Sequence, residues 1–495
     1  MCNRPATHAI SSRPNRPRTL FLSIYNLSNM RLIKNPLSVL IFSLFAFSAL
    51  TSCESEAVGR KINVPEEEGS PVSANQLTPP EWSKDAIIYE INVRQYSPAG
   101  DFAAVTSDLA RIKDLGVDIL WVMPIHPIGL DRRKGSLGSY YSVQDYKAVN
   151  PEFGTDADFK TFVDEAHNHG MKVILDWVAN HSAWDNVWYP QHDDFYTKDS
   201  VTGERIPPVE DWADVADLNY SNIEMRDSML DAFRYWVEEF DIDGYRCDVA
   251  GMVPIDFWQD MSKEVRSIKP DAFLLAEADE VIMHDNAFHM TYGWENHHIL
   301  NEIAKGHMTA NDLLAYFTKN DNSYGQSAYR MYFTSNHDEN TWNGTVWERM
   351  SDAARTMAAL TYVMPSSMPL IYNGQEDSLA HRLAFFDKDE IGWSGREVMG
   401  DFYRELNALK KSNEALWNGD FGGDYTVRLE KGSVLVLERS KGDNQILAVF
   451  NLSNLPVLMD AGLTDVANLT LETSRYASSD ITSLVAWDYL IYSNN

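Results

Sequence analysis

Acidic side chains close several apolar runs of this sequence. Asp176 follows MKVIL, Asp248 ends IDGYRCD, Glu277 ends AFLLAE and Asp338 follows MYFTSNH. Taken singly, an aspartate after a strand is more often a turn former or a helix cap. Four such placements favour one shared site, because a cluster of buried carboxylates is costly unless its proton affinities are used.

Paired carboxyl groups are suited to the cleavage of a glycosidic bond. One group protonates the departing oxygen and the other meets the oxocarbenium-like centre; at a spacing of about 5 Å the second group is the nucleophile and configuration is retained. Arg246 stands two residues before Asp248, where an arginine is often only a structural ion partner. His181 and His337 each follow an asparagine, and either one alone is as readily a core histidine as a ligand.

Eight short apolar runs are predicted to be the strands that carry these residues. Continuous apolar character is typical of strands buried on both faces, and the amphipathic stretches between the runs, such as 155–169 and 223–239, predict helices. The predicted strands are 86–93, 117–123, 171–178, 242–249, 272–278, 290–294, 331–336 and 368–374.

This alternation predicts the fold class α/β, with a parallel sheet and right-handed crossovers. A (β/α)₈ TIM barrel is the leading closure, and its active site would lie where the strands end, so the four carboxylates would meet at one mouth. A doubly wound open sheet is the alternative, although no glycine-rich phosphate loop follows the first strand.

The remaining segments complete the predicted domain organisation. The barrel takes up residues 81–417, with a short inserted loop domain at 182–221 after the third strand. An insertion of this length is usually functional. Residues 418–495 alternate as antiparallel strands do, and they predict a small C-terminal β-sandwich-like domain.

The N-terminal region predicts an export signal. The apolar run 37–50 is short for a transmembrane helix and follows Arg31 and Lys34, as in a signal peptide. The run leads into Leu50-Thr-Ser-Cys53, which resembles a bacterial lipobox and implies that Cys53 is lipidated. An uncleaved membrane anchor is the alternative, and both interpretations export the chain.

The surrounding residues extend this prediction. Met30 directly precedes the signal and is the expected start of translation, so residues 1–53 are interpreted as the signal and lipoprotein segment. Residues 54–80 are rich in Pro, Glu, Ser and Gly and predict a flexible tether. The protein is expected to be exported and lipid-anchored to a bacterial membrane, at the outer membrane, at the cell surface or facing the periplasm.

Charge and cysteine content exclude some functions. The formal net charge of −30 repels phosphate backbones, so nucleic acid is not an expected partner. Three cysteines do not make a disulfide framework. Cys247, flanked by candidate site residues, is interpreted as a buried packing residue because no Cys–His arrangement surrounds it.

The motifs resemble those of glycoside hydrolase family 13, the α-amylase family, over about residues 82–420 and the C-terminal domain. Four ordered blocks match the family: Asp176-Trp-Val-Ala-Asn180-His181, Gly244-Tyr-Arg246-Cys-Asp248, Glu277 within LLAEA, and Asn336-His337-Asp338. The resemblance therefore covers most of the chain and rests on several motifs in the family's order.

The resemblance implies a role for each matched carboxylate. Asp248 would be the nucleophile, Glu277 the general acid and then the base, and Asp338 the group that binds sugar hydroxyls in the transition state. Burial beside two carboxylates would supply the raised proton affinity that Glu277 needs.

The other matched residues would bind substrate or support the site. Arg246 would orient Asp248 and keep it ionised. Tyr141 would stack beneath the sugar, His181 and His337 would donate hydrogen bonds to it, and Asp176 would support the site through hydrogen bonds.

One departure from the family pattern narrows the substrate prediction, and one match concerns a metal. Gly251 and Met252 occupy the places where many α-amylases carry a Lys-His pair on the leaving-group side. Asn180 matches a calcium ligand of many relatives, but one asparagine makes no site. The sequence predicts that no cofactor is required, and calcium binding at Asn180 is kept as an additional possibility.

The sequence thus predicts a retaining glycoside hydrolase that cleaves α-1,4-glucosidic bonds in starch-derived α-glucans or malto-oligosaccharides. One alternative keeps this chemistry but makes the protein a transglycosylase, a neopullulanase, a cyclomaltodextrinase or a trehalose-synthase-like enzyme. The other is a membrane-tethered starch-binding protein without activity. The sequence leaves the oligomeric state open.

Overall fold

A computed structural model describes residues 75–325, 327–395, 399–460, 466, 468–476 and 480–494. The predicted signal segment with Met30 and Cys53 lies outside these residues, as does most of the predicted tether. The end of the tether prediction differs from the structure, because Leu77 is buried and Gln76 forms an isolated β-bridge with Asp285. Within the described ranges, no helix has the length and apolar character needed to cross a membrane.

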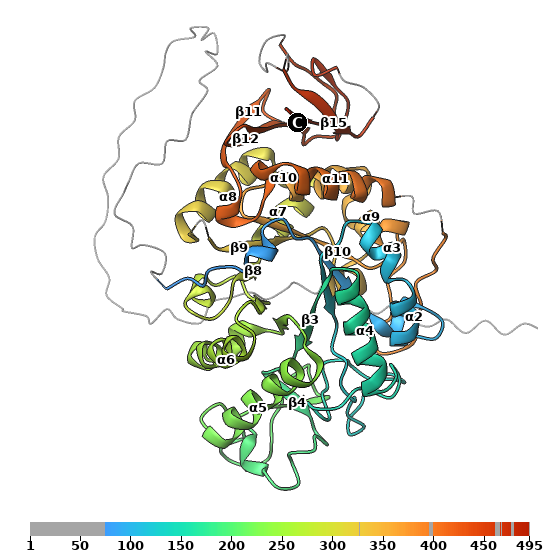
Figure 1. Cartoon of the computed structure of the whole chain (residues 1–495), viewed down its shortest axis with the longest axis vertical. Helices are drawn as coiled ribbons and strands as arrows, with labels where there is room; N and C mark the ends of the chain where they lie inside the picture. Colours follow the sequence, from blue (N-terminus) through green and yellow to red (C-terminus); the bar gives the residue numbers. More distant parts are fainter. Residues whose placement is uncertain are drawn as a thin grey trace, which may run out of the picture. The chain divides into compact units, whose positions relative to one another are not determined.

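Eight parallel strands close into a barrel. Figure 1 shows helices on several sides of its strands β3, β8, β9 and β10. Going around the barrel they follow chain order, and β1 pairs with both β2 and β10, which excludes the open-sheet alternative. The predicted (β/α)₈ barrel is therefore confirmed, and each predicted run overlaps one strand. The strands are β1 (Ile88–Ile91), β2 (Ile119–Val122), β3 (Lys172–Trp177), β6 (Gly244–Cys247), β7 (Phe273–Ala276), β8 (Met290–Tyr292), β9 (Tyr329–Tyr332) and β10 (Ser367–Tyr372).

Alternate residues of each strand pack on opposite sides of the barrel wall. On β2, Ile119 and Trp121 belong to the apolar cluster inside the barrel, whereas Leu120 and Val122 join the larger cluster between the strands and the helices. Burial of both faces is the reason that these strands read as continuous apolar runs.

The helices surround this wall. Two of them show why the sequence predicts their ends: α4 starts with a capping box between Thr155 and Asp158, and α5 ends at Asp241 in the left-handed conformation. The helices are α1 (Val93–Tyr96), α2 (Phe102–Ser107), α3 (Leu109–Asp114), α4 (Asp156–Asn168), α5 (Ile223–Phe240), α6 (Ile255–Ile268), α7 (Trp294–Ala304), α8 (Ala310–Ser323), α9 (Val346–Met350), α10 (Ala354–Val363) and α11 (Gly400–Ser412).

The insertion after β3 is ordered around a short antiparallel pair. β4 (His181–Ala183) pairs with β5 (Val215–Asp217), so the two ends of the insertion meet. The Arg205 guanidinium lies 3.3 Å from the ring centre of Tyr189, and that of Arg132 lies 3.6 Å from the Trp184 ring. The first of these cation–π contacts lies within the insertion, and the second ties the insertion to the loop after β2.

The C-terminal segment forms the predicted antiparallel domain. One face of its five-stranded sheet shares an apolar cluster with a separate two-stranded pair, which explains the sandwich-like pattern. The sheet order is β11 (Asp424–Glu430), β12 (Val434–Lys441), β13 (Asn444–Asn451), β17 (Tyr489–Ser493) and β15 (Thr470–Ser474), and the pair is β14 (Val457–Leu458) with β16 (Ser483–Leu484).

A network of ion pairs around the buried Asp243 stabilises the end of the barrel where the strands begin. Asp243, directly before β6, lies 2.9 Å from Lys172 Nζ, 2.8 Å from Lys269 Nζ and 2.7 Å from His167 Nε2. It also accepts a hydrogen bond from the Val173 amide. Burial opposes the charge of Asp243, but His167 and Lys269 outweigh it and lower the pKa of this carboxyl group.

Asp243→Asn is expected to lower the free energy of unfolding by about 2 kcal/mol, because it removes the buried anion to which the half-buried Lys172 and Lys269 donate. The folded-state pKa lies below the unfolded one, so the stabilisation is present above the ordinary aspartate pKa and is lost as pH falls through the lowered value. Urea unfolding at pH 7 and at pH 3 measures both effects. Asp241→Asn, at an exposed partner of Lys269, is the control and should change stability by less than about 1 kcal/mol. An equal loss in both variants would contradict the network's role.

Candidate active site

One buried guanidinium joins the predicted catalytic residues. On β6, Arg246 Nη1 lies 2.8 Å from Asp176 Oδ1 and 3.1 Å from Asp248 Oδ1, while Nη2 lies 2.8 Å from Glu277 Oε2. Its Nε donates to the Tyr292 hydroxyl at 3.0 Å. Arg246 therefore brings together carboxylates from the ends of three neighbouring strands, and its charge offsets part of their repulsion.

The backbone after Asp248 holds Glu277 in place. The Val249 amide donates to Glu277 Oε2 at 2.8 Å. Val249 adopts this position with φ of 36°, in the left-handed region that a β-branched residue rarely enters. Strain of this kind is typical of functional sites, and here it directs a backbone donor at one oxygen of a carboxyl group.

Asp248 and Glu277 hold protons more tightly than isolated carboxyl groups. Burial, and after it the charge of Glu277, raises the pKa of Asp248 well above its ordinary range. Burial also raises the pKa of Glu277, with Arg246 opposing and Asp338 adding to the effect. A coupled pair loses its protons in two steps, and between them one group is an acid while the other is an anion. The pair can therefore supply a proton donor and an anion at the same pH.

Asp338 and His337 follow β9 and complete the cluster. His337 Nε2 lies 3.3 Å from Asp338 Oδ2 and 2.8 Å from the Tyr141 hydroxyl, and its Nδ1 lies 2.5 Å from Glu90 Oε1. Burial opposes a charge on the imidazole, but Asp338 and Glu90 outweigh it and raise the pKa of His337 to about 9. The ring is thus a cation at neutral pH, with Nε2 directed at the site.

Glu90→Gln is expected to lower the pKa of His337 from about 9 by about one unit or more, because one of two close anions loses its charge. The imidazolium would then be lost at lower pH. An NMR titration of the histidine ring signals, with His337 assigned by its loss in His337→Gln, measures this shift. Glu376→Gln, at a buried glutamate paired with Arg111, is the matched control and should leave the His337 titration in place. An unmoved His337 titration in Glu90→Gln would contradict the pairing.

Asp176 and Tyr141 are hydrogen-bonded to each other beside the carboxylates. Asp176 Oδ2 accepts from Trp121 Nε1 at 3.1 Å and from the Tyr141 hydroxyl at 3.0 Å, so it supports its neighbours through hydrogen bonds. The Tyr141 ring stacks on His337 with centroids 5.5 Å apart. The Tyr141 ring is therefore fixed beside the carboxylates before any sugar binds.

His181 opens β4 and hydrogen-bonds to the backbone of Tyr141. Burial lowers its pKa to about 3, so at neutral pH it is an uncharged donor and acceptor. Asn180 Nδ2 donates to His181 Nδ1 at 3.2 Å. Among the residues that the structure describes, no three of His, Cys, Asp or Glu gather to hold a metal ion. Calcium at Asn180 stays a prediction, and no step below depends on it.

Three site residues were not predicted from the sequence. Glu90, Trp121 and Tyr292 lie inside apolar strands, and each contacts a predicted residue. A charged residue in the middle of the run AIIYEINV is a signal that could have identified Glu90. The two aromatic residues are indistinguishable from core residues in the sequence.

Cys247 is a buried packing residue, as its sequence neighbours predict. The thiol is free and buried, and it belongs to the apolar cluster between strands and helices. Burial raises its pKa well above the ordinary range, so the reactive thiolate is disfavoured.

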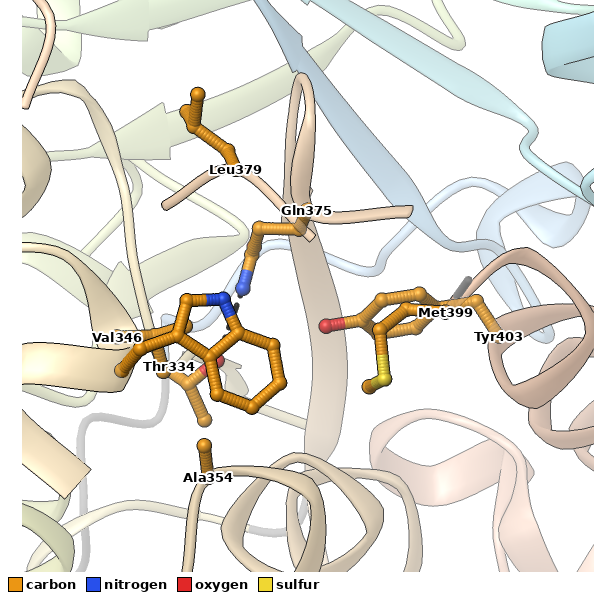
Figure 2. A pocket seen from close by; sticks show the side chains of 8 residues that line it. Thr334, Val346, Ala354, Gln375, Leu379, Met399 and Tyr403 are labelled. Atoms are coloured by element: carbon orange, nitrogen blue, oxygen red, sulfur yellow. Dashed lines mark hydrogen bonds between the residues drawn. The ribbon is translucent and has the colours of Figure 1, made fainter. Parts of the chain in front are cut away.

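A small cavity beyond β9, shown in Figure 2, is separate from the catalytic residues. Its volume is about 10 Å³, enough for about one water molecule. Gln375 Nε2 donates to Thr334 Oγ1 across it at 3.1 Å. None of the carboxylates lines it, so it is a packing gap behind the segment that carries Asp338. The lining residues are Thr334, Val346, Trp347, Ala354, Gln375, Leu379, Met399 and Tyr403.

This barrel and its site match a known family. The family model for the α-amylase catalytic domain matches residues 82–212 and 208–393. The chain belongs to the α-amylase family. The family assignment covers the barrel and every predicted catalytic residue, namely Asp248, Glu277 and Asp338.

Several members of the family are similar to this chain. The crystal structure of an α-amylase from Lactobacillus plantarum is 32% identical, with a TM-score of 0.73, and the match covers 83% of this chain and 99% of that one. AmyB, a noncanonic maltogenic α-amylase from Thermotoga neapolitana, is 32% identical with a TM-score of 0.69, covering 75% of this chain and 87% of that one. The α-amylase MalA of Haloarcula japonica is 28% identical over 83% of this chain, which spans only 62% of its length.

Proposed function

We propose that the protein is a retaining hydrolase of α-1,4-glucosidic bonds in starch-derived α-glucans or malto-oligosaccharides. The observation that carries this proposal is the contact of one guanidinium with both Asp248 and Glu277, at 3.1 and 2.8 Å. Two carboxylates on a single Arg246 are close enough to favour the short spacing of a retaining pair. The family and its amylase members support α-glucans as the substrate.

The reaction has two steps. In the first, an Asp248 oxygen bonds to the anomeric carbon while Glu277 protonates the glycosidic oxygen, so the leaving sugar departs with the Glu277 proton. In the second, Glu277 removes a proton from water, the water oxygen bonds to the anomeric carbon, and the Asp248 carboxylate is released. Configuration inverts twice and is retained overall.

The neighbouring residues act on the same sugar. Asp338 accepts hydrogen bonds from sugar hydroxyls and, as an anion, favours the positively charged transition state. The His337 cation and neutral His181 donate to hydroxyls, and Tyr141 contacts the apolar face of the ring. Asp176 keeps Arg246 and Tyr141 in position.

Product stereochemistry tests this proposal. Proton NMR of maltoheptaose hydrolysis is expected to show the α-anomer first, followed by slow mutarotation to the β-anomer. If the β-anomer formed before the α-anomer, water would displace the leaving group in a single step, and the Asp248 assignment would be wrong. Freshly dissolved α-glucose in the same buffer supplies the mutarotation baseline.

An oligosaccharide-acting or glycosyl-transferring enzyme is the second candidate. On the leaving-group side this chain has Gly251 and Met252 in place of a Lys-His pair. A side chain at position 251 would be crowded, because a Cβ on Gly251 would lie 3.1 Å from Glu280 Oε1. The maltogenic relative AmyB also favours this alternative. Products longer than the substrate, or trehalose from maltose, would support transfer, whereas glucose and maltose alone support hydrolysis. A non-catalytic starch-binding protein is disfavoured because Asp248, Glu277 and Asp338 are all present.

We further propose that the enzyme is exported and lipid-anchored through Cys53. The support is the apolar run 37–50 after two cations, followed by the lipobox-like Leu50-Thr-Ser-Cys53. Full-length protein expressed in a bacterium is expected to incorporate labelled palmitate and to sediment with membranes. Cys53→Ala should abolish the label, and Cys247→Ala, at a buried thiol, should retain it. Label in Cys53→Ala would contradict this proposal.

A further inference from the structure

Trp342 is an exposed aromatic residue beside the catalytic cluster. It lies in the short helical turn Glu339–Asn343, which follows Asp338, and 51% of its surface is exposed. Its Nε1 donates to Asp338 Oδ1 at 3.2 Å. The indole is therefore fixed at its edge to a site carboxylate while part of its surface meets solvent.

Further aromatic rings connect Trp342 to the buried part of the site. The Trp342 ring lies 5.2 Å from Phe385 and 5.9 Å from Phe386, centroid to centroid. Phe385 in turn stacks on Tyr141, with centroids 6.1 Å apart and ring planes 12° apart. This aromatic row, Tyr141–Phe385–Trp342, leads from the carboxylates towards solvent, and its packing keeps Trp342 in place.

Barrel order places this row on the glycone side of the scissile bond. Trp342 follows β9, Phe385 follows β10 and Tyr141 follows β2, which lie together on one arc of the wall. Glu277 follows β7 on the other arc, beside β6 and Gly251. Because Glu277 protonates the departing oxygen, the leaving group lies on its side and the row lies on the opposite one.

We propose that Trp342 is a binding residue for a second glucose unit, on the non-reducing side of the sugar held by Asp248 and Asp338. The indole face stacks on the apolar face of that glucose, and its N–H keeps Asp338 Oδ1 oriented. The Trp342 assignment rests on the proposed α-glucan hydrolysis and names a determinant of chain-length preference within it.

The test compares two variants that separate the ring from its N–H. Trp342→Ala removes both, whereas Trp342→Phe keeps an aromatic face and loses only the donor. Kinetics use 4-nitrophenyl α-glycosides of one to four glucose units, so the leaving group is constant and only the glycone lengthens. Calorimetric titration with maltotriose and maltoheptaose in the Asp248→Asn background measures binding without turnover. Tyr476→Ala, at an exposed tyrosine of the C-terminal domain, is the control.

The expected results distinguish stacking from a structural role. In wild type, the second glucose unit should increase kcat/KM, and in Trp342→Ala this increase should be about tenfold smaller. Maltoheptaose binding to Trp342→Ala should weaken by a similar factor. Trp342→Phe should keep most of the increase and most of the binding. An undiminished gain in Trp342→Ala, or an equal loss in Trp342→Phe, would overturn the stacking. If the Trp342 proposal fails but the wild type hydrolyses maltoheptaose in the same experiment, the proposed function is still supported. If the wild type neither binds nor cleaves malto-oligosaccharides, both proposals are contradicted.

Discussion

Asp248→Asn is expected to lower kcat on maltoheptaose by at least about 10⁴-fold, because the amide is a poor nucleophile for the anomeric carbon. The change keeps the shape of the side chain and removes one negative charge from a site where Arg246 faces several carboxylates. Folding stability should therefore be preserved, and thermal unfolding of the purified variant checks this. Reducing-sugar release from maltoheptaose measures the loss.

The charge change at Asp248 also predicts a shift at its neighbour. The charge of Asp248 and that of Glu277 disfavour each other, so with asparagine in place Glu277 should lose its proton at lower pH. Asp256→Asn, on the exposed surface of α6, is the matched control and should keep full activity. Residual activity above about 1% of wild type in Asp248→Asn would mean that another group attacks the sugar.

The second large effect is expected in Glu277→Gln. Loss of the general acid should lower kcat/KM on malto-oligosaccharides by about 10²–10⁴-fold. The loss should be smaller on 4-nitrophenyl α-maltoside, because 4-nitrophenolate leaves with little need of a proton. Glucan binding should be largely intact, since the amide keeps the shape of the side chain and can still accept the Val249 hydrogen bond.

The pH dependence of the wild type provides an independent check on Glu277. Its raised pKa keeps the acid protonated to higher pH, and kcat/KM should fall as pH rises through that value. In Glu277→Gln this limb should disappear from the profile with malto-oligosaccharides. Glu264→Gln, at a partly exposed glutamate of α6, is the control. An unchanged limb in Glu277→Gln would assign the acid to another residue.

Local patterns in the sequence were sufficient to predict the strands and to single out four acidic residues at their ends. Strands buried on both faces have to be apolar throughout, and the eight runs are visible for that reason. Asp176, Asp248, Glu277 and Asp338 stand out because each follows such a run. The Thr155 capping box shows the start of α4 in the same way.

Contacts between distant segments required the tertiary structure. Glu90 and His337 are 247 positions apart and meet because β1 pairs with β10, which pairs with β9. Strand β9 also lies at Tyr329–Tyr332, slightly before the predicted run 331–336, because residues after it leave the wall to form the site.

The sequence by itself therefore determined the barrel and the positions of acidic residues at the strand ends, since these depend on hydrophobic periodicity and on residues next to strand ends. The tertiary structure decided that Arg246 contacts three carboxylates, that Glu90 contacts His337 and helps to raise its pKa, and that Trp342 is exposed beside Asp338. The physical reason is that periodicity is a local property of the chain, whereas an ion pair or an aromatic row exists only after the barrel closes.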